Sequence, residues 1–297
     1  MSVRVGVVGA GLMGTGIAQV FAAAGHEVDL YDPNASALER ARERIAQVFG
    51  LLGQPPGGAA RVTFRDELEP ALARAGFVVE AGPERLPVKQ ELFERFSELA
   101  PADAILASNT SSIPIRGIVE RVADRTRTIG THFWNPPYVV KLVEVVQSDA
   151  TAPGTVARTI ELLDGAGMRP VHVKADVPGF VGNRLQHALK REAFALIAAG
   201  VCDAETIDTV VKLGFGRRLA VLGPMEQTDL VGLDLTLDIH SVLMPSLDVT
   251  PGPHPLLVEK VERGELGMKT GRGFREWTPE EARAVRDRLD RELLDRG

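Results

Sequence analysis

The segment THFWNPPYVVKLVEVV, residues 131–146, contains a histidine and a carboxylate that could work as a pair. His132 stands at the end of an apolar stretch that includes Ile129 and Gly130. Glu144 lies within the run Leu142–Val146, which is typical of a buried strand. A carboxylate buried there is costly unless a partner compensates it. The letters NPP between the two residues could turn the chain back, so that a strand–turn–strand places the imidazole beside the carboxylate. That arrangement makes a general base and the group that orients it; a structural histidine bonded to a backbone carbonyl, with the glutamate on an arginine, is the alternative.

A second set of residues, near the N-terminus, is typical of a dinucleotide site. VGVVGAGLMGTGIA carries Gly9, Gly11 and Gly14 directly after a predicted strand and at the start of a predicted helix. Gly9 permits a tight turn, Gly11 lets the backbone approach a pyrophosphate, and Gly14 lets helix and strand pack closely. Asp32 ends the second predicted strand and should hydrogen-bond the adenosine ribose hydroxyls, which favours NAD over NADP. A glycine-rich turn without a ligand, and an aspartate that only ends a strand, are the alternatives.

The secondary-structure elements predicted to position these residues differ between the N-terminal and the C-terminal part of the chain. Up to about residue 175, β-branched runs alternate with stretches whose apolar residues recur at helical spacing, which predicts a mostly parallel, doubly wound sheet. After DVPGF (176–180) the strands stop and helices follow, separated by glycine and proline. We predict strands over 3–9, 27–32, 77–81, 104–109, 127–133, 141–146 and 170–175. We predict helices over 13–25, 35–49, 86–100, 153–167, 182–200, 203–214, 226–244, 255–267 and 278–297.

Composition narrows the class of protein. With 297 residues, 44% of them hydrophobic and 25% charged, the chain is long enough for two globular domains. A net charge of −6 without a long basic run argues against nucleic acid and anionic membranes as partners. The single cysteine, Cys202, allows no internal disulfide and no two-cysteine metal site, and we predict no metal. No apolar run reaches membrane-spanning length, and a first strand starting near Val3 leaves no room for a signal peptide, so we expect a cytoplasmic protein.

Several segments together resemble the L-3-hydroxyacyl-CoA dehydrogenase superfamily over essentially the whole chain. They are, in order, GAGLMGTGIA, VVEAGPERLPVKQELF, ASNTSS, THFWNPPYVVKLVEVV, DVPGFVGNRL, LGPMEQTDLVGLD and GELGMKTGRGF. The resemblance implies a Rossmann-type NAD-binding domain over residues 1–178 and an all-helical substrate and dimerisation domain over 179–297. It also implies a homodimer and the oxidation of an L-3-hydroxyacyl substrate to the 3-keto compound, as in fatty acid metabolism. A catalytically silent NAD-binding structural protein is the alternative of another class.

The resemblance assigns roles to individual residues. His132 matches the general base and Glu144 its partner, while Ser111 and Asn183 match the groups that position the substrate oxygen. An N-terminal helix-capping role is the alternative for Asn183, and a turn role is the alternative for Asn135. For Glu84, Lys89 and Lys269, solvated surface charges are the alternative. The residues matched to the cofactor are Gly9, Gly11, Leu12, Met13, Gly14, Asp32, Glu84, Lys89, Asn109, Asn135 and Lys269.

The chain departs from the family pattern in places that concern the substrate. The segment from Asp32 to Glu80 is short, with one helix and the loop GLLGQPPGGAARV where members that use CoA carry a helical hairpin. NPPY, NRLQ and GFGRRLAVLGPMEQ resemble the branch with L-gulonate 3-dehydrogenase and carnitine dehydrogenase, which oxidise free 3-hydroxy acids, whereas GELGMKTGRGF resembles the acyl-CoA branch. Trp134 stands where a smaller or phenylalanine-like residue is expected. The acyl-CoA thioester and the free acid therefore both stay open.

Overall fold

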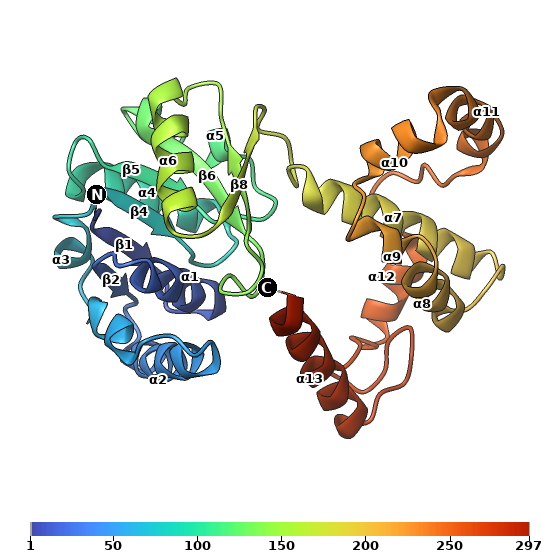
Figure 1. The fold of residues 1–297 in the computed structure, drawn as a ribbon, viewed down its shortest axis with the longest axis horizontal. Helices are drawn as coiled ribbons and strands as arrows, with labels where there is room; N and C mark the ends of the chain where they lie inside the picture. Colours follow the sequence, from blue (N-terminus) through green and yellow to red (C-terminus); the bar gives the residue numbers. More distant parts are fainter. Residues whose placement is uncertain (1, 297) are drawn as a thin grey trace. The chain divides into compact units, whose positions relative to one another are not determined.

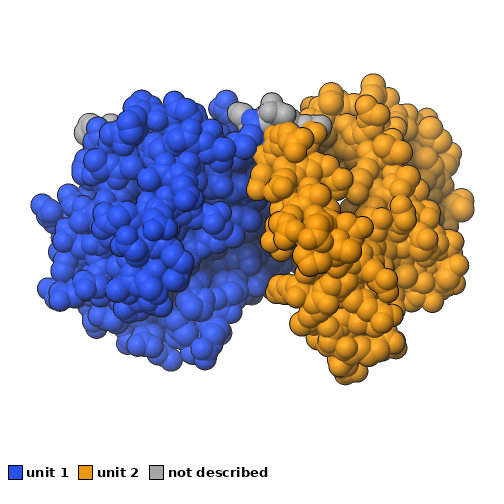
Figure 2. All heavy atoms as spheres, turned by 90° about the horizontal axis from the view of Figure 1, so that it is seen from below, with its two compact units in different colours: residues 1–184, 293–297 blue, residues 185–292 orange. Residues whose placement is uncertain are grey.

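The computed structural model describes residues 2–296, without the side chains of the last two of these, and the chain divides into two compact units. Unit 1 comprises the residues up to Arg184 together with those from Leu293 on, and unit 2 is Leu185–Glu292 (Figure 2). Within the described residues no helix is both long and apolar enough to cross a membrane.

Unit 1 is built around an eight-stranded sheet in the order β3-β2-β1-β4-β5-β6-β7-β8. Every neighbouring pair is parallel except β6 and β7, which run antiparallel. The predicted doubly wound, mostly parallel sheet is therefore confirmed. The strands are β1 (Val5–Val8), β2 (Val28–Tyr31), β3 (Val62–Arg65), β4 (Phe77–Glu80), β5 (Ile105–Ser108), β6 (Thr128–Phe133), β7 (Leu142–Val146) and β8 (Arg169–Val173).

Helices cover both faces of this sheet (Figure 1). One core packs α1 (Leu12–Ala23), α2 (Ala35–Leu51) and α6 (Pro153–Gly165) on one face. The other core packs α3 (Leu68–Leu72), α4 (Leu86–Leu99) and α5 (Ile115–Ile118) on the opposite face. Val7 and Val8, neighbours in β1, belong to different cores, as the alternation of side chains along a strand requires.

Strand β3 and the short helices α3, α5 and α9 (Gly216–Leu219) were missing from the sequence prediction. The loop 53–60 contains instead the start of a 3-10 helix, Pro56–Arg61, which leads directly into β3 at the edge of the sheet. Only Val62 of β3 is buried, because an edge strand has a single strand neighbour. A four-residue strand with little burial carries too weak an alternation to be recognised.

Unit 2 is helical, as predicted (Figure 1). The predicted helix over 226–244 is wrong in one respect: Gly232, with φ 103°, breaks it in two. Thr278 and Glu281 form a capping box at the start of the last helix: Thr278 N donates to Glu281 Oε2 at 2.8 Å, and Glu281 N donates to Thr278 Oγ1 at 3.2 Å. The helices are α7 (Gly182–Ala198), α8 (Ala204–Leu213), α9 (Gly216–Leu219), α10 (Pro224–Val231), α11 (Leu233–Leu243), α12 (Pro255–Glu262) and α13 (Pro279–Arg296).

Candidate active site

His132 and Glu144 are directly opposite each other on the antiparallel strands β6 and β7. The distance between His132 Nδ1 and Glu144 Oε2 is 2.8 Å, and the two residues are 6% and 1% exposed. The predicted contact between them is therefore confirmed, and the alternative of a histidine bonded to a backbone carbonyl is wrong. Because the carboxylate can only accept a hydrogen bond, it selects the tautomer with the proton on Nδ1.

The second oxygen of Glu144 is bonded to the chain just ahead of α7. Oε1 accepts the backbone N–H groups of Val181 and Gly182 at 2.9 and 3.0 Å. Burial by itself would raise the pKa of Glu144, but the hydrogen bonds from His132 and from these two N–H groups outweigh it and hold the pKa below its ordinary value of 4.5. Glu144 is thus a charged acceptor that is held next to the imidazole by three hydrogen bonds.

This lowered pKa predicts a pH dependence of folding stability. The unfolded chain protonates Glu144 at a higher pH than the folded chain does, so the stabilisation is present above pH 4.5 and is lost as the pH falls through the folded pKa. We expect the free energy of unfolding to fall less steeply between about pH 5 and pH 3 in Glu144→Gln than in the wild type. Urea unfolding at a series of pH values measures both slopes. Glu161→Gln, at an exposed position of α6, is the matched control and should keep the wild-type slope.

Ser111 lies in the loop after β5, at the carboxyl end of the parallel strands. Asn183, in the first turn of α7, donates from Nδ2 to the carbonyl oxygen of Ser111 at 2.9 Å. The side chain of Asn183 therefore acts as a donor to another segment in this structure. Glu84 Oε1 also accepts bonds from three successive residues of the loop: Thr110 Oγ1 at 2.6 Å, Ser111 N at 3.0 Å and Ser112 N at 3.2 Å.

A buried ion pair between Lys89 and Glu80, which the sequence did not predict, is connected to this loop through Glu84. Lys89 is 1% exposed and Glu80 is 0% exposed, and Lys89 Nζ lies 2.8 and 2.7 Å from the two oxygens of Glu80. Ser108 donates to the same carboxylate, and Glu84 Oε2 lies 3.2 Å from Lys89 Nζ. The alternative of a solvated surface charge is therefore wrong for Lys89. Its ammonium is engaged by carboxylates inside unit 1, and through Glu84 it is connected to the loop of Ser111.

The glycine-rich turn has the geometry that a dinucleotide needs. Gly9 has φ +107°, and a Cβ on Gly14 would lie 1.8 Å from the carbonyl oxygen of Gly9. A Cβ on Gly11 would meet no atom within 4 Å, so the space above this residue is open. Gly11 is the N-cap of α1 and no side chain caps it, which leaves the N–H groups of the first turn available to an anion.

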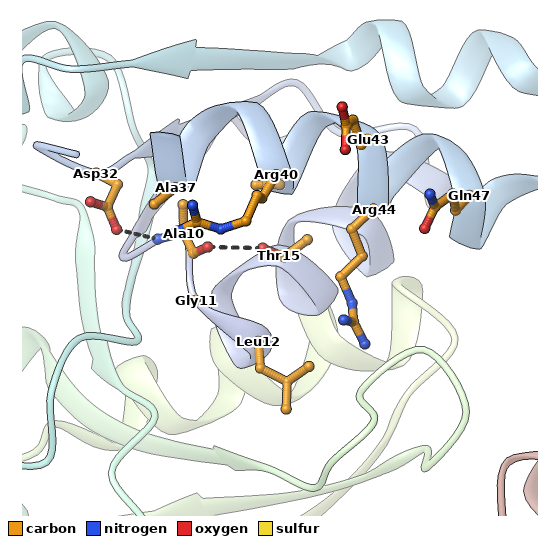
Figure 3. A pocket seen from close by; sticks show the side chains of 11 residues that line it. Ala10, Gly11, Leu12, Thr15, Asp32, Ala37, Arg40, Glu43, Arg44 and Gln47 are labelled. Atoms are coloured by element: carbon orange, nitrogen blue, oxygen red, sulfur yellow. Dashed lines mark hydrogen bonds between the residues drawn. The ribbon is translucent and has the colours of Figure 1, made fainter. Parts of the chain in front are cut away.

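Asp32 lies beside this turn and lines a cavity of about 410 Å³ with it (Figure 3). Its Oδ2 accepts the backbone N–H of Ala10 at 2.9 Å, which fixes the carboxylate next to the glycines. Leu12, 48% exposed, also lines the cavity. Figure 3 shows Arg40 and Arg44 on the side of α2 that faces the start of α1. A pyrophosphate at the open turn and a ribose at Asp32 fit this arrangement of residues.

Gly11 and Gly14 predict different outcomes for one added methyl group. Gly11→Ala should keep the melting temperature of the wild type, because the methyl group would meet open space, yet weaken NADH binding by about tenfold or more where it approaches the phosphates. Gly14→Ala should lower the melting temperature, because its methyl group overlaps the backbone of Gly9. Calorimetry for stability and fluorescence titration with NADH separate the two effects. Unaltered NADH affinity in a folded Gly11→Ala would contradict this placement of the pyrophosphate.

The other residues matched to the cofactor lie in several environments. Asn109 follows β5 and accepts the backbone N–H of Phe133 at 2.9 Å, so it ties the loop of Ser111 to the end of β6. Met13 is half-buried in the first turn of α1, and Asn135 is exposed in the turn after β6. Lys269 is exposed and belongs to unit 2, so its assignment stays a prediction.

Comparison with known proteins agrees with this architecture. Residues 4–177 match the family model for the NAD-binding domain of 3-hydroxyacyl-CoA dehydrogenase, and residues 179–277 match the model for its C-terminal domain. The chain belongs to the 3-hydroxyacyl-CoA dehydrogenase family: it is an NAD-dependent oxidoreductase of the kind that acts on a CH–OH group.

Its relatives act on different substrates. It is 37% identical to 5-formyl-3-hydroxy-2-methylpyridine 4-carboxylate 5-dehydrogenase of Mesorhizobium japonicum, over 98% of this chain and 96% of the relative. It is 39% identical to the probable 3-hydroxybutyryl-CoA dehydrogenase of Bacillus subtilis, over 90% and 95% of the two chains. Among solved structures, a 5-formyl-3-hydroxy-2-methylpyridine 4-carboxylic acid 5-dehydrogenase, described as an NAD⁺-dependent dismutase, is similar with a TM-score of 0.93 and 37% identity, covering 99% of this chain and 97% of that one. The (S)-3-hydroxybutyryl-CoA dehydrogenase of Ralstonia eutropha has a TM-score of 0.79 and 32% identity, covering 94% and 100%.

Proposed function

We propose that the protein oxidises the hydroxyl group of an L-3-hydroxyacyl compound to a ketone, with His132 as the general base. The observation that carries this proposal is the 2.8 Å contact between His132 Nδ1 and Glu144 Oε2. It leaves Nε2 of the same ring as the nitrogen that receives a proton, and it places a negative charge where the imidazolium needs it. Val181 and Gly182 satisfy the remaining oxygen of Glu144, so the carboxylate is held in position.

In the proposed reaction His132 accepts the proton, and Ser111 and Asn183 hold the substrate oxygen. The hydroxyl proton moves to His132 Nε2, the oxygen keeps the electron pair of the O–H bond and forms the carbonyl, and the C3–H bond breaks. NAD, when bound, accepts the hydride from that carbon. The second N–H of Asn183 Nδ2 would hold the oxygen, since the first N–H of that amide is engaged by the carbonyl of Ser111. Ser111 Oγ, which lies 3.4 Å from Glu84 Oε1, would turn its O–H from that carboxylate to the substrate oxygen. The reverse reduction would use the same groups.

A free hydroxy acid is the second candidate substrate. Between α2 and β3 the chain forms only the 3-10 helix Pro56–Arg61, so within the described residues this segment holds no helical hairpin. The relatives named L-carnitine dehydrogenase, 39% identical over 77% of this chain, are named for a substrate without CoA. Both observations favour a compact acid, whereas the relatives named for 3-hydroxybutyryl-CoA favour the thioester.

The experiment that tests the function is NAD reduction with L-3-hydroxybutyryl-CoA and, in parallel, with free L-3-hydroxybutyrate, L-gulonate and L-carnitine. A much larger kcat/KM for the thioester supports the acyl-CoA substrate and a role in fatty acid metabolism. A larger kcat/KM for a free acid supports the second candidate. Failure to turn over any of the four, while NADH still binds, would overturn the proposal that the substrate is an L-3-hydroxyacyl compound.

We also propose that unit 2 pairs with a second copy of this chain. Among the described residues, none of the helices α7 to α12 contains a buried residue. Large apolar side chains are exposed instead, for example Leu230 at 73%, Leu237 at 67% and Val242 at 81%. Apolar surface on this scale marks an interaction site. We expect sedimentation equilibrium to give twice the chain mass, and Leu237→Glu to shift it toward the monomer; a monomeric wild type would contradict the proposal.

A further inference from the structure

Trp134 lies beside the proposed base. It comes two residues after His132 and directly follows β6, which ends at Phe133. The centroids of the imidazole and the indole are 5.2 Å apart, with an interplanar angle of 50°. Phe180 lies 5.8 Å from the same imidazole. His132 is therefore bordered by two aromatic rings, and Trp134 is the one that is half-buried rather than buried.

The indole occupies room that only a glycine at position 182 leaves free. A Cβ on Gly182 would lie 2.3 Å from Cζ2 and 3.0 Å from Cη2 of Trp134. The backbone of Gly182 does not itself require glycine, because its φ lies outside the left-handed region in which Gly179 is found. Glycine at position 182 therefore leaves the space that the indole of Trp134 fills. Gly182 also donates its N–H to Glu144, so the indole, the glycine and the base form one connected group.

The indole N–H of Trp134 makes no hydrogen bond to the described part of the chain: Nε1 is buried and has no partner there. A phenylalanine would avoid this unpaired donor, since leaving a buried donor unpaired opposes folding. What tryptophan supplies at this position is the size and the flat surface of its ring next to His132.

We propose that Trp134, seated on Gly182, is a specificity-determining residue that restricts the substrate to a compact group on the carbon that carries the hydroxyl. This inference rests on the proposed function, because it takes His132 as the base. The reacting carbon must lie within reach of the imidazole, and a substituent that extends from it toward the start of α7 meets the indole. A short, unbranched or flat group fits beside the ring, whereas a long acyl tail on that side requires the indole to move.

The test is kcat/KM along a series of increasing chain length, from 3-hydroxybutyryl through 3-hydroxyhexanoyl to 3-hydroxydecanoyl, in whichever form the wild type turns over. The wild type should favour the shortest member. In Trp134→Ala the ratio of kcat/KM for the longest to the shortest member should rise by about tenfold or more, the effect expected when a pocket is enlarged by several methylene groups. A ratio within about threefold of the wild-type ratio would overturn the inference.

Gly182→Ala tests whether Gly182 affects the chain-length preference through the indole of Trp134. It should displace the indole and alter the ratio in the wild-type background, but it should have no further effect in Trp134→Ala, because its action passes through the ring. A fully additive effect would contradict the pairing of the two residues. A wild type that turns over neither a member of this series nor L-gulonate nor L-carnitine overturns the proposed function and this inference together. An active wild type that turns over no member of the series, or whose ratio is unaltered in Trp134→Ala, overturns this inference alone.

A second measurement does not depend on a folded Trp134→Ala. The chain contains two tryptophans, so Trp277→Phe leaves Trp134 as the single tryptophan reporter. In that variant, with NAD⁺ present so that no reduction can occur, acetoacetyl-CoA or free acetoacetate should alter the tryptophan emission on binding, since the ligand contacts the indole. Binding detected by calorimetry without any change in emission would contradict the contact.

Discussion

Replacing His132 by glutamine is expected to lower kcat by about three orders of magnitude while NADH binds with nearly the wild-type Kd. Glutamine keeps a polar side chain opposite Glu144 but cannot take the hydroxyl proton. The imidazole is 6% exposed on β6, and no contact places it at the glycine-rich turn, so the cofactor affinity has no reason to fall. Steady-state kinetics with the best substrate and fluorescence titration with NADH give the two numbers.

The matched control is His172→Gln. His172 lies on β8 of the same sheet, is exposed, and its Nε2 contacts the side-chain oxygen of Gln147 at 2.9 Å. This variant should keep the wild-type kcat. Turnover within about tenfold of the wild type in His132→Gln would show that His132 is not the general base.

The second large effect concerns stability. Lys89→Met should lower the free energy of unfolding by about 3–5 kcal/mol, because it leaves the carboxylate of Glu80 buried without its counter-charge. Glu80 is 0% exposed, and both of its oxygens lie within 2.8 Å of Lys89 Nζ. Denaturant unfolding followed by circular dichroism measures the loss. Methionine is the suitable replacement because it preserves most of the length and apolar volume of the lysine side chain.

Two further variants show whether the burial of the ion pair is the cause of the lower free energy of unfolding in Lys89→Met. Arg61→Met breaks an ion pair with Glu27 whose side chains are 45% and 48% exposed, and it should cost less than about 1 kcal/mol. The double variant Lys89→Met with Glu80→Gln should recover part of the loss, because it removes the unpaired charge. Equal losses in Arg61→Met and Lys89→Met would contradict the argument from burial.

The parts of the site that the sequence predicted are those set by short-range rules. The contact between His132 and Glu144 follows from two strands with a turn between them, because the alternation of side chains then puts both residues on one side. The glycine-rich turn follows from the positions of Gly9, Gly11 and Gly14 relative to one strand and one helix. The strand–helix alternation was equally local, and it gave the sheet and all of its strands except β3.

The parts that the sequence did not predict depend on long-range placement. A lysine is rarely buried, so nothing in VVEAGPERLPVKQELF distinguishes Lys89 from a surface residue. One signal was present: Glu80 interrupts an apolar strand in the same way as Glu144 does, and a carboxylate in that position calls for a buried partner. Glu84 anchors the loop of Ser111 from 27 residues away, and no local pattern encodes that contact.

The site combines contacts of very different span along the chain. His132 and Glu144 are 12 residues apart, whereas Asn183 and the carbonyl of Ser111 are 72 residues apart. Loop-closure entropy grows with the logarithm of the span, so the longer contact costs about 1.6 kcal/mol more chain entropy than the shorter one. The proposed base and its carboxylate therefore form a local unit that one pair of strands can assemble. The groups proposed to hold the substrate oxygen come together only when chain segments far apart in the sequence have already been ordered.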